Sequence, residues 1–197
     1  EYNNVIRDLM RVDFKPAKGF PADDSGHGFD NIGDVLSMSP LLLEKYLAAA
    51  EKIAELAIAV PPRGRELNPK DITDFQKQYF RYPIPREMRR RAAEEFVRSF
   101  LRRAYRREVT QAEVERVLQF AKQAVDDGGG LEDAVRLAVQ AVLVSPYFLF
   151  RWELDGAPNN PKAIRSLNGY ELASRLSFFV WSSLPDDRLL QLADKGQ

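Results

Sequence analysis

Apolar residues recur three and four positions apart along most of this 197-residue chain. That spacing places them on one face of an α-helix. Helix-start signals agree with it, because Ser-Pro pairs stand at 39–40 and 145–146, and Thr110 precedes Glu113 with the spacing of a capping box. No segment shows a competing strand pattern. We therefore expect an all-α protein, an irregular multi-helix bundle, with helices over these ranges: 1–10, 39–60, 85–107, 110–127, 131–144, 145–152, 168–183 and 185–197. Because the segment 131–144 is nearly apolar, we expect it to be the central buried helix.

Two stretches rich in proline and glycine interrupt the helical pattern, at 11–38 and 61–84. Unstructured segments of this length are unusual inside a compact domain unless they have a function or are disordered. Aromatic residues in the first stretch, among them Phe14, Phe20 and Phe29, favour a long ordered loop that packs on the body. The second stretch is interpreted as a connector between two packed helical parts, which aromatic side chains attach to a helical surface: Phe75, Tyr79, Phe80 and Tyr82. The expected organisation is a first domain at 1–60, the connector at 61–84, a second domain at 85–154 and the start of a third at 155–197.

Composition excludes several classes of chemistry. The chain has no cysteine and one histidine, which rules out disulfides, thiolate nucleophiles, iron–sulfur ligation, covalent attachment of haem c and a two-histidine zinc site within it. Lysine plus arginine equals aspartate plus glutamate at 29 each, so no overall charge favours nucleic acid or anionic lipid. No apolar run approaches the roughly 20 residues that span a bilayer. We therefore expect neither a nucleic-acid partner nor a membrane-spanning segment.

The segment 23–31 combines three aspartates, two glycines and the single histidine. Calcium prefers six to eight oxygen ligands from a flexible backbone, so Asp23, Asp24, Asp30 and Asn31 are candidate ligands for Ca²⁺. The alternative is that these side chains cap turns and the following helix. His27 is a candidate axial haem ligand or proton shuttle. The competing interpretation, which we favour, is a loop histidine that is hydrogen-bonded to a neighbouring aspartate.

Arginine is concentrated in the helix expected at 85–107, where only three glutamates offset it. Guanidinium groups pair with carboxylates and related anions in a bidentate manner. Four of these arginines, Arg102, Arg103, Arg106 and Arg107, are candidates for docking an acidic partner, a haem propionate or an anionic polysaccharide. The alternative is a solvated helix face with ion pairs four residues apart. The helix expected at 85–107 contains nine arginines in all, at positions 86, 89, 90, 91, 98, 102, 103, 106 and 107.

Aromatic side chains gather in two other expected helices, and they could line a ligand pocket or, as we expect, fill the core of the bundle. No nucleophile elbow, phosphate-binding loop or paired metal motif is present, so no catalytic residue is assigned. The aromatic residues are Tyr147, Phe148, Phe150, Trp152, Phe178, Phe179 and Trp181.

Several of these segments resemble domains of large secreted cytochrome-like proteins of planctomycetes and related bacteria. The segments 2–9, 23–36 and 39–46 resemble one such domain, those between 102 and 151 a second, and 170–187 the start of a third. The resemblance implies domains without an assigned activity, in an exported, periplasmic or extracellular protein whose haem c is carried by a separate cytochrome module. The connector is short where many relatives carry an inserted module, and both ends look truncated, within the first and third domains.

The expected function is therefore a non-catalytic helical scaffold or interaction region of an exported, cytochrome-associated multidomain protein. Its expected partners are other domains of the same polypeptide, including a cytochrome module, and no cofactor is expected within this chain apart from the calcium considered above. The alternative is a part of a haem-linked oxidoreductase that acts on an organic or polysaccharide-derived substrate.

Overall fold

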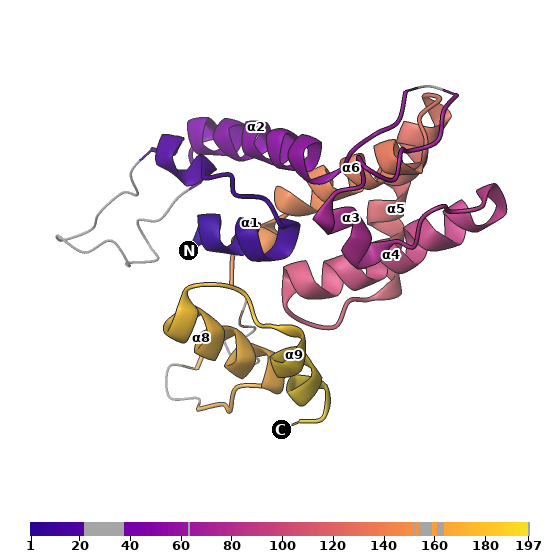
Figure 1. Cartoon of the computed structure of the whole chain (residues 1–197). Coiled ribbons are helices and arrows are strands. Elements are labelled where there is room, and N and C mark those ends of the chain that lie inside the picture. The colour runs from indigo at the N-terminus through magenta and orange to yellow at the C-terminus, as the bar shows by residue number, and fades with distance from the viewer. Residues whose placement is uncertain (22–37, 63, 152, 154–158, 161–163, 197) are drawn as a thin grey trace.

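The computed structural model describes residues 1–21, 38–62, 64–151, 153, 159–160 and 164–196. Within these ranges every regular element is helical, which confirms the all-α expectation (Figure 1). The α-helices are α1 (Tyr2–Met10), α2 (Pro40–Ala57), α3 (Asp74–Tyr79), α4 (Arg89–Tyr105), α5 (Gln111–Asp126), α6 (Leu131–Leu143), α7 (Pro146–Leu149), α8 (Gly169–Trp181) and α9 (Asp187–Asp194). Short 3-10 helices lie at Pro16–Gly19 and Arg86–Met88.

Helix α6 lies at the centre of the core and contacts α2, α4 and α5. Its sequence is nearly apolar, and burial of such a helix against several neighbours is the main source of helical stability in proteins. The expectation of a central buried helix at 131–144 is confirmed. Its buried apolar residues are Leu131, Ala134, Val135, Ala138, Val139, Val142 and Leu143.

The connector at 61–84 is fastened to the body by a fully buried glutamine. Gln76 accepts a hydrogen bond from the Ala59 N–H and donates one to the Ala59 carbonyl, both at 3.0 Å. The same amide donates to the Tyr82 hydroxyl at 3.0 Å. Beside it, the Phe75 ring meets the Phe96 ring on α4 edge-on, with centroids 6.0 Å apart. The aromatic residues of the connector therefore hold it against a helix, as the sequence predicts.

Residues near the start of the long loop also pack on the body. Phe20 lies 4.7 Å from Tyr46 and 5.4 Å from Tyr2 between ring centroids. The Ala17 N–H donates to the Asn3 side chain at 3.1 Å. The expected packing therefore holds for this part of the loop, whereas Phe29 lies outside the described residues.

Helices α8 and α9 lie beside α1 and α4 and are joined to them through polar side chains (Figure 1). The Ser183 hydroxyl donates to the Asp8 carboxylate at 2.6 Å. Asn4 donates to the Ser182 carbonyl at 3.4 Å. The segment between α8 and α9 is therefore attached to α1, although nearly the whole chain separates them.

The buried face of α8 differs from the face that the sequence pattern predicts to be buried. The expected apolar stripe is largely exposed, and the side chains that point inward are small residues and one ring: Ala173, Ser177 and Phe178. Phe179 is 90% exposed, so the prediction that it and Trp181 belong to a bundle core is wrong. The physical reason is that, among the described elements, only α9 packs extensively against α8. The exposed residues are Leu172, Leu176, Phe179, Val180 and Trp181.

A similar correction applies to the ends of other helices. The buried residues of α2 all lie in its second half, whereas Leu43 and Leu47 in the first half are exposed. Met88 and Val125, which the pattern also places on buried stripes, are exposed at the start of α4 and the end of α5. A periodic pattern identifies a helix, but only the position of the neighbouring helices determines how far along it burial extends.

Candidate functional site

The first two docking candidates, Arg102 and Arg103, connect α4 to α9. Arg102 donates to the Asp194 carboxylate and also, at 3.4 Å, to the Leu190 carbonyl at the far end of the chain. The Arg103 Nε atom lies 3.4 Å from the Asp187 carboxylate. Both guanidinium groups are therefore engaged in holding the last helix against the second domain.

Arg106 follows α4 directly, in the left-handed conformation (φ 58°) that commonly ends a helix. Its side chain turns inward, and the residue is only 5% exposed. The guanidinium donates to four backbone carbonyls, at 2.9, 3.2, 3.1 and 2.7 Å. Three of these carbonyls belong to α7 and the residue after it, where a helix end leaves acceptors unsatisfied. The acceptors are Ala104, Phe148, Tyr147 and Phe150.

The charge of Arg106 has no carboxylate partner among the described residues. Burial, and after it the nearby Arg151 and Arg107, lowers the pKa of Arg106 to about 10. The side chain is still protonated at neutral pH. It therefore adds a positive potential to the region around it while its N–H groups are occupied.

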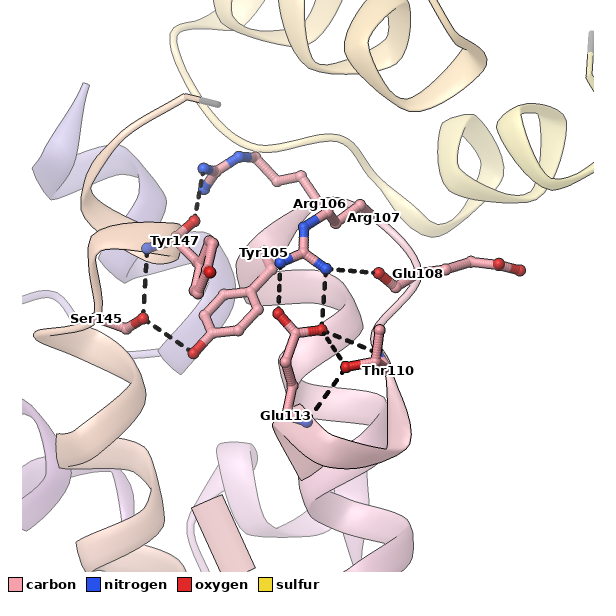
Figure 2. A network of polar contacts seen from close by, with 8 residues as sticks. All are labelled: Tyr105, Arg106, Arg107, Glu108, Thr110, Glu113, Ser145 and Tyr147. Carbon is pink, nitrogen blue, oxygen red and sulfur yellow. Dashed lines mark hydrogen bonds and ion pairs between the residues drawn. The ribbon is translucent and has the colours of Figure 1, made fainter. Parts of the chain in front are cut away.

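Arg107 is directed to the opposite side, toward Glu113 on α5 (Figure 2). The two side chains form a bidentate pair with distances of 2.6 and 3.1 Å. Glu113 also accepts from the Thr110 backbone N–H at 2.9 Å, and the Glu113 N–H donates to the Thr110 hydroxyl. The hydrogen bond from Arg107 makes the largest contribution to the lowered pKa of Glu113. Together with the capping box it lowers this pKa to about 2. The guanidinium carbon of Arg107 lies 5.0 Å from the centre of the Tyr147 ring and 5.6 Å from that of Tyr105.

The same arrangement occurs a second time, at the start of α8. Arg165 forms a bidentate pair with Glu171 at 2.7 and 3.0 Å. Glu171 completes a capping box with Asn168. In both copies the arginine stands three residues before the capping residue and six before the glutamate. The sequence Arg-x-x-Thr/Asn-x-x-Glu thus builds the same braced helix start in two domains.

These two helix starts border a cleft of about 630 Å³ between the second domain and α8. Among the described residues, three glutamates and six arginines line it. Each glutamate is bound by one arginine, since Glu153 pairs with Arg175 in the same manner as the two pairs above. The remaining cations in the lining are Arg106, Arg116 and Arg151, so the described part of the cleft carries an excess of positive charge. Arg151 lies over the Phe178 ring at 4.8 Å and 3.7 Å from the Glu1 carboxylate.

The structure thus distributes the four predicted docking residues rather than presenting them on one face. Arg102 and Arg103 lie at the junction with α9, Arg106 is buried, and Arg107 lines the cleft. Four arginines of the cleft were not predicted as site residues, because they lie outside the arginine-rich helix in the sequence. The repeated spacing of the capping box could have indicated Arg165, whereas nothing local distinguishes the others, Arg116, Arg151 and Arg175.

The calcium candidates Asp23, Asp24, Asp30 and Asn31, and the haem-ligand candidate His27, lie outside the described residues. Within the described ranges no three histidine, cysteine, aspartate or glutamate side chains gather as a metal site would require. None of the helices that the structure describes is both long and apolar enough to cross a membrane.

Three family models match the chain in succession. Residues 1–59 match one described as PSD3, a protein of unknown function (DUF1587). Residues 92–153 match PSD5, a protein of unknown function (DUF1595), and residues 167–197 match PSD4, a protein of unknown function (DUF1592). The searches of curated proteins and of solved structures found no match. The chain therefore contains three consecutive planctomycete-type domains, each of unknown function.

Proposed function

We propose that this chain is a non-catalytic helical interaction region of an exported multidomain protein that also carries a c-type cytochrome module. The observation that supports the first part is how the three domains are joined. Polar side chains that could serve chemistry instead hold one domain to another, as the Ser183–Asp8 and Arg102–Asp194 contacts do. A chain with such junctions would offer a partner several domains in one fixed arrangement.

The arrangement of Arg106 supports the same proposal. A buried guanidinium that donates to four carbonyls is held in one geometry by its acceptors. Buried polar networks whose donors and acceptors are all satisfied tend to rigidify a fold. Residues 104–150 are therefore suited to the role of a stable platform for further domains.

Two parts of the proposal, export of the protein and the presence of a cytochrome module, rest on the family resemblance. Both are tested on the intact gene product. We expect it to encode a Cys-x-x-Cys-His segment outside these residues and to be recovered from the periplasm or the medium after cell fractionation. A gene product that encodes no such segment, or one retained in the cytoplasm, would contradict this part of the proposal.

The interaction itself is tested with two purified proteins: this chain and the cytochrome module of the same gene product. Isothermal titration calorimetry should show saturable binding, and the chain alone should show no absorption band in the visible range. Absence of binding would remove the interaction proposal. The alternative, a haem-linked oxidoreductase, predicts instead that the intact protein loses turnover of an organic or sugar-derived substrate when residues 1–197 are deleted while its haem spectrum is kept.

A further inference from the structure

The arginine-lined cleft continues into a second hollow of about 470 Å³ on the surface of α5 and α7. Four residues border both: Tyr105, Glu113, Arg116 and Tyr147. The second hollow is mainly apolar, and its remaining lining consists of Val117, Phe120, Ala141, Ser145 and Pro146. A charged compartment thus adjoins an apolar one, and Arg116 lies where they meet.

Arg116 lies at the border between the two hollows, and no other described side chain neutralises its charge. Its nearest carboxylate along the helix face, Glu113, is already bound by Arg107 and by Thr110. Among the described residues no ion pair or hydrogen bond to the Arg116 side chain is found. The neighbouring charge of Arg106 is likewise not matched by a carboxylate among the described residues of the cleft, whereas Arg151 lies 3.7 Å from the Glu1 carboxylate. An anion in this place would therefore gain attraction without having to break an existing pair.

The apolar side of the border is also open. Phe120 is 42% exposed and Tyr147 is 37% exposed, and both line the second hollow. Exposed rings beside a fixed charge are a usual feature of small-molecule sites, which are mostly apolar with a few polar groups that orient the ligand. The volumes of both hollows fall in the range of such sites, about 300–1,000 Å³.

We propose that this border is a binding site for an amphiphilic organic anion. The anionic group, a carboxylate or a group of similar charge, pairs with Arg116 on the side of the cleft, and an apolar body lies against Phe120 and Pro146. The proposal goes beyond the interaction role above, because a small ligand can bind here whether or not a cytochrome module docks elsewhere.

Three probes separate the two halves of the site. 4-Phenylbutyrate carries both a carboxylate and an apolar body, acetate carries only the charge, and 4-phenylbutanol carries only the apolar body. Titration of each into the 197-residue chain, followed by calorimetry and by amide NMR shifts, should give the tightest saturable binding for 4-phenylbutyrate. No saturable binding of 4-phenylbutyrate, or equal affinity for acetate, would overturn the proposal.

Variants then locate the ligand. Arg116→Gln should weaken 4-phenylbutyrate binding about three- to five-fold, as loss of one exposed ion pair at the upper end of the usual range predicts, whereas Arg116→Lys should restore part of it. Phe120→Ala should weaken binding of both phenyl probes. The matched control is Lys122→Gln, which removes an exposed cation that pairs with Asp126 on the same helix and should leave affinity within about two-fold. Circular dichroism confirms that each variant is folded, and equal affinity of Arg116→Gln and wild type would refute the assignment.

Discussion

The buried guanidinium of Arg106 permits a quantitative prediction about stability. Replacing it by methionine, Arg106→Met, retains much of the side-chain volume and removes four hydrogen bonds. The carbonyls of Tyr147 and Phe150 belong to exposed residues, which favours their hydration, whereas Phe148 is buried. A buried acceptor left without a partner costs about 1–3 kcal/mol. Two such acceptors, those of Ala104 and Phe148, give a loss of roughly 2–6 kcal/mol.

An opposing contribution reduces this loss. Burial lowers the pKa of Arg106 from its usual value to about 10, which corresponds to about 3 kcal/mol of unfavourable free energy for the charged form. Methionine does not carry that penalty and leaves no uncompensated charge behind, only carbonyls without a donor. Because both carbonyls are buried, we take the middle and upper part of the range, about 4–6 kcal/mol; subtracting about 3 kcal/mol leaves an expected net loss of about 1–3 kcal/mol in the free energy of unfolding.

Urea denaturation followed by circular dichroism measures this change. The matched control is Arg98→Met on the same helix, where the arginine is exposed and bonds only to the Gln111 side chain; we expect it to alter stability by no more than about 0.5 kcal/mol. Arg106→Lys should fall between the two, because an ammonium group keeps the charge and cannot reach all four carbonyls. If Arg106→Met were as stable as Arg98→Met, the reasoning that these carbonyls depend on the guanidinium would be refuted.

Three further predictions concern other contacts. The pKa of Glu113 is about 2, below its usual 4.5, so this carboxylate stabilises the fold above pH 4.5 and loses the effect as pH falls toward 2. Glu113→Gln should remove about 2 kcal/mol of that acid-sensitive stability. An unchanged dependence of stability on pH in the variant would contradict the prediction. Gln76→Leu leaves both Ala59 backbone groups without their partner and should lower the free energy of unfolding by about 2–4 kcal/mol, measured in urea. Phe178→Ala should cost about 3 kcal/mol, whereas its neighbour Phe179→Ala, 90% exposed, should cost less than about 0.5 kcal/mol; equal melting temperatures for these two variants would show that the burial of α8 is wrongly assigned.

The positions of the helices were predictable from local signals, except for that of α3, which lies within the proline-rich stretch at 61–84. Ser39 caps α2, Thr110 completes the capping box of α5, and Asn168 caps α8, each through a side chain that accepts from a backbone N–H three residues on. These interactions lie within one turn of the chain. The nearly apolar sequence of α6 likewise indicated its central position before any contact was known.

The candidate site was predictable only in part, because arginines are paired by proximity in space. The cluster at 102–107 is plain in the sequence, but its members go to α9, to the carbonyls of α7 and to α5. The contribution of Arg116 depends on which neighbouring carboxylate is already occupied, and that is a property of the folded chain.

Local sequence thus determined that the protein is built from helices, and it determined where most of them begin and end. The reason is that capping and periodicity act over a few residues. Tertiary structure decided which faces are covered, as the exposed stripe of α8 shows, and which charges are neutralised, as Arg106 and Arg116 show. Burial and ion pairing depend on the distance between segments far apart in the sequence. They therefore emerge only when the helices are packed together.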